Sequence, residues 1–421
     1  MKYITFFSEM SQEDVETFGG KNAALGEMIQ NLEKQGIPIP KGFATTAQAY
    51  WKHIDENNLR ETIKKHLKDI QIDTSLSGLR TAGKKIRQCI AEAPLPEDVA
   101  DEIRSAYRKL SQEYGQEACD VAIRSSATAE DLPHASFAGQ QETFLNVSGE
   151  DMVIMYCKHG MASLFTDRAI VYREENDFKH MNVALSVGVQ KMVRSDKASA
   201  GVAFTLDTET GFKDVVSITS SYGLGETVVQ GEVNPDTFIV HKTKLQEGYT
   251  PIIHKYLGDK RKKLIYADAR GETQTKLVDL SEDERHTFSL TDEEICTLAR
   301  YCIDIEQYYS RVHDTWYPMD IEWAKDGIDG KIYIVQARPE TVHSQEEQGK
   351  KLVEYELDAP HEEQDIITQG RRVGRGVASG RAHVVSTLDE IEDFQEGDIL
   401  VTQMTGPDWL PIMKKASAII T

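Results

Sequence analysis

Residues 121–146 read VAIRSSATAEDLPHASFAGQQETFLN. The apolar run at 121–123 predicts a strand that delivers Arg124, and a long run of small, hydroxylic and glycine residues follows it. Such residues make a loop that can fold over a ligand and offer hydroxyl and N–H groups to phosphate oxygens. Composition alone also allows a flexible surface loop. In both cases the segment predicts a strand and a loop within a mixed α and β chain.

The composition limits the class of partner. The chain has 421 residues, of which 48 are Lys or Arg and 69 are Asp or Glu, so its formal net charge is −21. This length predicts about two or three domains, and a hydrophobic content of 40% excludes wholesale disorder. The excess of acid argues against a nucleic acid partner, because phosphate neutralisation needs a basic face. An anionic ligand must therefore be held by a few local basic side chains and N–H groups.

The sequence shows neither a membrane pattern nor a disulfide pattern. No stretch approaches the roughly 18 apolar residues that a spanning helix needs. The first residues lack the cleavage site of a signal peptide. The five cysteines are odd in number and have no CxxC spacing, which is typical of reduced thiols. We therefore expect a cytoplasmic protein with no membrane partner.

Four parts of the chain differ in pattern. Residues 1–118 are rich in helical periodicity, and residues 119–345 mix strands with helices. Residues 346–370 are charged and poor in large apolar side chains, which predicts a linker. Residues 371–421 return to strand-like patterns with many glycines. The expected fold class is mixed α and β.

Individual elements follow from local signals. Helical spacing and helix-ending residues predict helices over 24–32, 46–57 and 96–114. Thr291 and Glu294 form a capping box that begins another helix. Apolar runs predict strands at 121–123, 187–189, 215–218 and 238–240.

The stretch 318–339 predicts a β-hairpin. Apolar and acidic residues alternate in its first strand, so Asp320 and Glu322 share one face. The turn-rich residues 326–330 lead into a second strand over 331–339.

A hairpin centred on this turn sets Gln336 opposite Asp320 and Ile334 opposite Glu322. In that register the two carboxylates share a face with Gln336 and Arg338. Two carboxylates and an amide oxygen suit Mg²⁺ that bridges phosphates, and the arginine balances phosphate charge. A solvated polar face on an ordinary hairpin is the alternative.

Gly19, Gly20 and Lys21 stand where a helix is expected to begin. Paired glycines let a backbone approach a phosphate, and a helix N-terminus offers free N–H groups next to the lysine charge. The sequence contains no GxxxxGK[ST] string, so this is not a P-loop. For the motif alone, a glycine-rich turn before an ordinary helix is the commoner explanation.

The string from Arg124 to Asn146 closely resembles the ATP-binding signature of phosphoenolpyruvate synthases, in the pyruvate/phosphate dikinase family. GGKNAALGE at 19–27 and PKGF at 40–43 are similar to the same family's N-terminal segment. The resemblance spans essentially the whole chain. It implies an ATP-grasp-like domain over 1–345 that binds ATP and Mg²⁺.

The resemblance also extends to single positions, with Gln190 at the adenine edge. It implies ATP contacts from Lys21, Arg124, Gly139, Thr143, Gln190, Glu322, Gln336 and Arg338. The implied metal ligands are Glu322 and Gln336, with Asp320 and Glu232 as further candidates.

Members of this family convert pyruvate, ATP and water into phosphoenolpyruvate, AMP and phosphate. The resemblance implies a phosphorylated histidine on a swivelling domain, a C-terminal barrel that binds pyruvate, and in many members a homodimer. Residues 371–421 are similar to the start of the swivelling domain. None of the twelve histidines stands in the family's Thr-Cys-His-Ala motif, and His383 is expected to be a structural strand residue. We therefore expect no catalytic residue here, and binding of Mg·ATP without turnover.

Three other functions fit parts of the sequence. A rifampin phosphotransferase-like dikinase shares the signature, but it inserts a drug-binding domain for which the chain has no room. A carboxylate–amine ligase fits the ATP site but not residues 371–421. A free-standing, non-catalytic nucleotide-binding module fits both regions, and the reading frame beyond Thr421 distinguishes it from a fragment.

Overall fold

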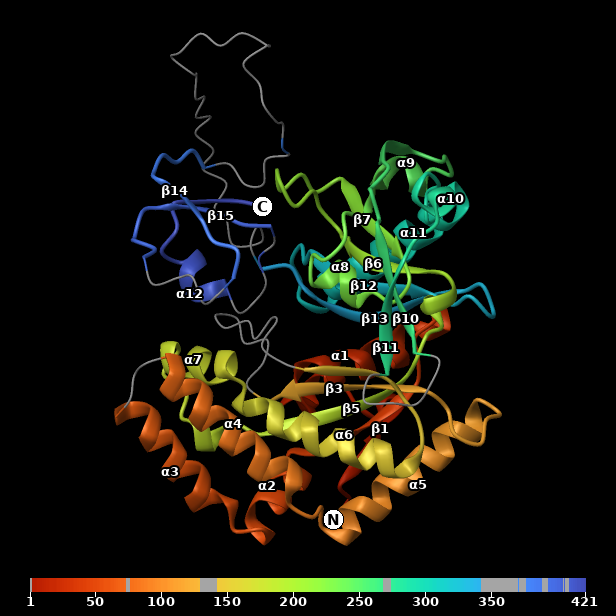
Figure 1. Cartoon of the computed structure of the whole chain (residues 1–421). Coiled ribbons are helices and arrows are strands. Elements are labelled where there is room, and N and C mark those ends of the chain that lie inside the picture. Colours follow the sequence, from red (N-terminus) through yellow and green to blue (C-terminus); the bar gives the residue numbers. More distant parts are fainter. Residues whose placement is uncertain are drawn as a thin grey trace.

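The computed structural model describes residues 2–72, 76–128, 142–267, 274–341, 370, 376–387, 393–403, 405 and 409–421. It is a mixed α and β structure with several sheets, as the sequence predicts (Figure 1). The expected linker at 346–370 lies outside the described residues except for Gly370.

The first sheet is antiparallel and carries Arg124. Its strands follow the order β1 (Ile4–Phe6), β2 (Gly42–Thr45), β5 (Leu185–Lys191), β3 (Val121–Ala127) and β4 (Thr143–Val147). Alternation along β3 sends Val121 and Ile123 into one core and leaves Arg124 on the opposite face. Both β3 and β5 contain the strand residues predicted from the sequence.

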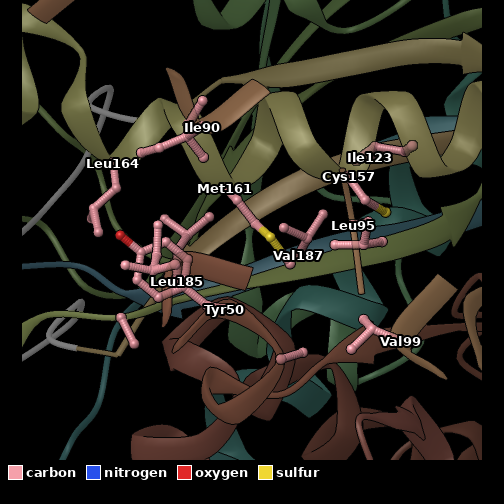
Figure 2. Close-up of a cluster of buried hydrophobic side chains, with 14 of the residues drawn as sticks. Tyr50, Ile90, Leu95, Val99, Ile123, Cys157, Met161, Leu164, Leu185 and Val187 are labelled. Carbon is pink, nitrogen blue, oxygen red and sulfur yellow. The ribbon is translucent and has the colours of Figure 1, made fainter. Parts of the chain in front are cut away.

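Helices cover the face of this sheet that carries Ile123. They are α2 (Ala47–Glu56), α3 (Leu59–Ile72), α4 (Leu76–Glu92), α5 (Glu97–Glu113), α6 (Glu150–Ala162) and α7 (Asp167–Glu175). Their apolar side chains form one buried cluster with β3 and β5, as Figure 2 shows around Met161, Leu185 and Val187. The predicted helices over 46–57 and 96–114 are α2 and α5 with their capping residues.

Helix α1 (Val15–Asn31) contacts the opposite face of the sheet. The chain kinks at Gly19, whose φ of +73° favours glycine, and a Cβ there would lie 2.2 Å from Ser126 Oγ. One turn later, the Asn22 side chain donates to Ser186 Oγ at 2.9 Å. The regular helix therefore begins just after Gly19, on the Arg124 face of the sheet, and extends the helix predicted at 24–32 towards the N-terminus.

The second sheet is also antiparallel. Its order is β13 (Ile332–Pro339), β12 (Met319–Lys325), β6 (Ser199–Phe204), β7 (Val215–Tyr222), β8 (Asp236–His241) and β9 (Ile252–Tyr256). Helix α11 (Asp292–Val312) covers one face and begins with the predicted capping box of Thr291 and Glu294. A second buried cluster joins α1, α11 and this face of the sheet. The two sheets are thus bridged by α1.

The predicted register of the β12–β13 hairpin was wrong. Glu322 pairs with Gln336, and Asp320 pairs with Arg338. Two features cause the difference. The Asp326 N–H bonds the Lys331 carbonyl at 2.8 Å, which moves the turn centre beyond Ile328.

The second feature is a β-bulge after Glu322. Trp323 pairs with Ile334, so Val335 is the extra residue of the bulged strand. Together the two features shift the Glu322 pairing by two residues, and an even shift leaves side chains on the same face. The predicted sharing of one face by the four polar residues therefore holds.

The remaining elements surround the second sheet or form a small C-terminal sheet. The former are α8 (Glu226–Val229), α9 (Lys242–Gln246), α10 (Glu282–Arg285) and the hairpin of β10 (Lys262–Tyr266) with β11 (Thr275–Asp279). The latter comprises the parallel strands β14 (Ala382–Val384), β15 (Ile399–Val401) and β16 (Ala418–Ile420) with α12 (Leu410–Met413). Their small core is formed by Val385, Phe394, Leu400 and Ile412.

Two further expectations concern cysteines and membranes. All five cysteines are free thiols, as their odd number and spacing predicted. Within the described residues, no helix has both the length and the apolar character that a membrane span requires.

Candidate functional site

Arg124 joins the two sheets. Its Nη2 donates to Glu322 Oε2 at 2.9 Å and to Gln336 Oε1 at 2.5 Å. Its Nη1 donates to the Val335 carbonyl at 2.9 Å and to Gln190 Oε1 at 3.3 Å. The site therefore consists of Arg124, Gln190, Glu322, Gln336 and the Val335 carbonyl, which we call the Arg124 cluster.

Strand geometry explains why these groups meet. Gln190 and Arg124 lie on neighbouring strands, and each side chain leaves the face opposite the helical core. Glu322 and Gln336 are direct partners across β12 and β13. The guanidinium of Arg124 thus joins residues about two hundred positions apart in the chain. The pairing confirms that Glu322 and Gln336 share a face of the hairpin, and Arg124 is a partner that the hairpin pattern alone did not predict.

The Val335 carbonyl is a member of the Arg124 cluster that the sequence did not predict. Val335 is the bulged residue of β13, and its carbonyl accepts from Arg124 and, at 3.4 Å, from Gln190 Nε2. Bulges often redirect a group next to a binding site. No side-chain pattern signals a backbone carbonyl, and bulge positions depend on the pairing of distant strands.

Asp320 and Arg338 form a second ion pair on the same face. Arg338 Nε and Nη2 lie 2.8 and 2.7 Å from Asp320 Oδ2. Burial raises the pKa of the Asp320 carboxyl, Arg338 opposes that shift, and the nearby negative charge of Glu322 adds to it. The face thus carries two carboxylates, one guanidinium and one amide at two neighbouring register positions.

Lys21 belongs to the same side of the first sheet. It follows the kink at Gly19, where the backbone packs against Ser126, two residues from Arg124 on the same face of β3. Helix α1 also contacts β13. The half-buried lysine therefore lies in the first turn of a helix that borders both sheets of the cluster.

The other predicted residues have separate outcomes. Thr143 pairs with Arg124 across β3 and β4 and is exposed. Gly139 lies outside the described residues. Glu232 is exposed in the loop after α8, where its charge adds to burial in raising the pKa of Glu226. The role of Glu232 in the site stays a prediction.

The donor chemistry of the Arg124 cluster fits a divalent cation. Glu322 and Gln336 direct two oxygens at one positively charged nitrogen, so both already favour a cation at that point. Carboxylate and amide oxygens are the ligands that Mg²⁺ takes in proteins. Within the described parts of the chain, no group of three His, Cys, Asp or Glu side chains has a metal-binding arrangement. A cation here would therefore depend on the amide of Gln336.

Two cavities lie outside the cluster. One, of about 530 Å³, is lined by Lys197, Lys325 and the β12–β13 turn, and the other, of about 590 Å³, by Glu306, Arg311 and Trp316. Neither is lined by a residue of the Arg124 cluster. The cluster is the stronger candidate because its groups come from two sheets and converge.

His383 lies on a strand, as the sequence predicted, and its structural role stays a prediction. It lies in β14 and its Nδ1 is 3.2 Å from Asp398 Oδ2. Its ring also lies 5.3 Å from that of Phe394 in the small C-terminal core.

Two parts of the chain match known protein families. Residues 15–359 match the family described as pyruvate phosphate dikinase, AMP/ATP-binding domain. Residues 394–421 match the family described as PEP-utilising enzyme, mobile domain.

Curated relatives match the chain along its whole length. Phosphoenolpyruvate synthases from Helicobacter pylori and Aquifex aeolicus are each 50% identical to it over 100% and 99% of the chain. The one from Escherichia coli is 48% identical over 99%. These alignments cover 52%, 49% and 51% of the respective relatives. The chain thus spans about half the length of the curated relatives it matches.

Proposed function

Because the chain belongs to the family of the pyruvate phosphate dikinase AMP/ATP-binding domain, we propose that the Arg124 cluster binds Mg·ATP. The observation that carries this proposal is the convergence of two oxygen ligands and a guanidinium between the two sheets. A nucleotide phosphate bound with a metal needs both kinds of group, because the metal takes oxygen ligands and the phosphate takes charged N–H donors.

Each residue of the site has a distinct role in this proposal. Glu322 and Gln336 hold Mg²⁺, with Asp320 as a neighbouring carboxylate. The metal, when bound, neutralises phosphate charge and orients the phosphates. Arg124 and Arg338 donate to phosphate oxygens, as arginine forks do.

The remaining contacts place the rest of the nucleotide. Lys21 adds a charge at the start of a helix, where N–H groups also favour anions. Gln190 faces the adenine edge with its amide, and Thr143 and Gly139 border the nucleotide. Glu232 is a further candidate for the metal end.

The fold and domain division follow the same proposal. Residues 1–345 form an ATP-grasp-like domain, 346–370 a linker, and 371–421 the first part of a swivelling phosphohistidine domain. The match of 394–421 to a mobile domain supports this division. The parallel order of β14, β15 and β16 sets this region apart from the two antiparallel sheets.

The relatives' printed name suggests the reaction to which the site contributes. We propose that the chain supplies the ATP-binding part of a phosphoenolpyruvate synthase, which turns ATP, pyruvate and water into AMP, phosphoenolpyruvate and phosphate. No histidine of the sequence stands in a Thr-Cys-His context. The chain on its own therefore binds Mg·ATP without completing turnover. The proposal also includes a cytoplasmic location and a homodimeric state for the whole protein.

Calorimetry with Mg·ATP tests the proposed site. The unaltered chain binds Mg·ATP, and Arg124→Ala weakens binding by about 10- to 100-fold, because hydrogen bonds to charged groups contribute about 1.5–3 kcal/mol. Arg108→Ala is the matched control, since Arg108 pairs with Glu150 on the exposed surface of α5. The absence of Mg·ATP binding by the unaltered chain, or equal binding by all three proteins, would overturn the proposal.

A further inference from the structure

Arg124 bonds one carboxylate oxygen of Glu322 and the single side-chain oxygen of Gln336, the two proposed metal ligands. Its Nη2 bonds both Glu322 Oε2 and Gln336 Oε1. Resting on the function proposed above, we propose that Arg124 is an internal cation that competes with the metal for this site. Its guanidinium leaves Glu322 and Gln336 when the metal binds and takes a phosphate of the nucleotide instead.

The competition follows from charge and distance. Gln336 offers a single oxygen, which lies 2.5 Å from the Nη2 of Arg124. A Mg²⁺ ion on the same oxygen lies about 2.1 Å from it, so the two cations would be less than about 5 Å apart. Like charges at this separation repel strongly in a partly desolvated site. Arg124 and a divalent cation therefore do not share Gln336 and Glu322 without a loss of affinity.

The other half of the guanidinium gives it a fixed point during the exchange. Nη1 bonds the Val335 carbonyl at 2.9 Å and Gln190 Oε1 at 3.3 Å, and neither group belongs to the proposed metal ligands. Only the Nη2 contacts need to change. The bulge that exposes the Val335 carbonyl is thus the element that keeps Arg124 at the site after it releases Glu322.

The exchange couples metal and nucleotide. A metal that binds alone leaves the Nη2 of Arg124 without its carboxylate, which opposes binding. A nucleotide phosphate offers the guanidinium a new anionic partner, so the opposing effect disappears when both ligands are present. Such coupling is reciprocal, so the metal also strengthens nucleotide binding. The arginine therefore makes the site selective for the metal–nucleotide complex over the free metal.

The test measures binding of Mn²⁺ alone, without nucleotide, by electron paramagnetic resonance of the free ion. Arg124→Met removes the competing cation and raises the affinity for Mn²⁺ by about tenfold or more, which corresponds to about 1.4 kcal/mol. Arg338→Met removes an equal charge that contacts Asp320, so its effect is smaller. The double variant Arg124→Met with Glu322→Gln loses the gain.

Three results would overturn the competition: no gain in Arg124→Met, an equal gain in Arg338→Met, or a gain that survives Glu322→Gln. Arg124→Lys is used if the methionine variant does not fold. Lysine keeps the positive charge but lacks the second nitrogen that bonds the Val335 carbonyl and Gln190, so it is held less firmly at the site. A gain in Mn²⁺ affinity of about threefold is therefore expected, and the absence of any gain would contradict the proposal. Calorimetry of the unaltered chain with Mg·ATP separates the two proposals. If the unaltered chain binds Mg·ATP but the variants gain no affinity for Mn²⁺, only the proposed competition is overturned. If the unaltered chain does not bind Mg·ATP, the proposed function is overturned.

Discussion

Among the ion pairs of the described residues, the Asp236–Lys260 pair and the Arg124–Glu322 pair have different surroundings. Asp236 and Lys260 are 0% exposed. Both oxygens of Asp236 are engaged, Oδ1 by Lys260 and the Gly258 N–H, and Oδ2 by the N–H and hydroxyl of Ser289. Arg124 and Glu322 keep 14% and 25% of their side-chain surface exposed.

This difference distinguishes a structural pair from the pair that we propose exchanges its partner. The Asp236 pair is formed within the second sheet and the loops beside it, and no surface of either side chain is open to solvent. The Arg124 pair spans two sheets, and its remaining exposure allows a ligand to reach the same groups. A fully satisfied buried pair strongly resists loss of a partner, whereas a partly exposed pair between two sheets can exchange one.

The largest expected effect comes from a substitution that breaks the Asp236–Lys260 pair. Asp236→Asn leaves the Lys260 ammonium buried without a counter-charge, and the free energy of unfolding falls by about 3–5 kcal/mol. Urea unfolding followed by tryptophan fluorescence measures the loss. Arg124→Met lowers the stability by less than half as much, because Glu322, the carboxylate that it leaves unpaired, keeps contact with solvent. Equal losses in the two variants would contradict the distinction between the clusters.

A smaller effect is expected in the pH dependence of stability, through the Asp320–Arg338 pair. Burial raises the folded-state pKa of Asp320 above its ordinary value of 3.8, despite Arg338. A raised pKa contributes stability that is complete below the unfolded value and is lost as the pH rises through the folded value. The stability of the natural chain relative to Asp320→Asn therefore falls from about pH 4 upwards. The fall is about 1.4 kcal/mol for each pH unit that separates the unfolded pKa from the folded pKa.

Urea unfolding of both proteins between about pH 3.5 and 7 measures this slope. Asp98 provides a control of opposite sign, because a hydrogen bond from Lys52 lowers its pKa. The stability of the natural chain relative to Asp98→Asn is therefore lost as the pH falls. A flat or rising curve for the Asp320 pair would show that burial does not raise the pKa of this carboxyl in the folded chain.

The smallest expected effect comes from a substitution of Gln190 in the Arg124 cluster. The hydrogen bonds of Gln190 to Arg124 and to the Val335 carbonyl are long, at 3.3 and 3.4 Å. Gln190→Met therefore weakens Mg·ATP binding by only about two- to tenfold, the range of a neutral hydrogen bond. Calorimetry measures the change, with unfolding as a check that stability is unaltered. A loss as large as that of Arg124→Ala would place Gln190 among the charged contacts.

Local chemistry made much of the secondary structure predictable. Thr46 and Thr291 cap α2 and α11 because their hydroxyls accept from backbone N–H groups three residues on, and this depends on neighbours in sequence. The alternation at 319–323 gave the shared face of Asp320 and Glu322 for the same reason. Strand periodicity survives an even shift of register, so the face was right although the pairing was wrong.

The rest depended on contacts between distant segments. The bulge at Val335 results from pairing against β12, and no local pattern marks it. The bond between Arg124 and Glu322 links positions 198 residues apart. The resemblance to a known family identified both residues, but not that one directly holds the other.

The sequence by itself determined the mixed class, the capped helices, the strand that carries Arg124 and the oxygen-rich face of the hairpin, because these follow from side-chain type and periodicity along short stretches. Only the tertiary structure decided the register, the carbonyl of Val335 and the guanidinium that joins two sheets. Those features arise where strands from separate parts of the chain meet, and their geometry is set by packing across the whole fold.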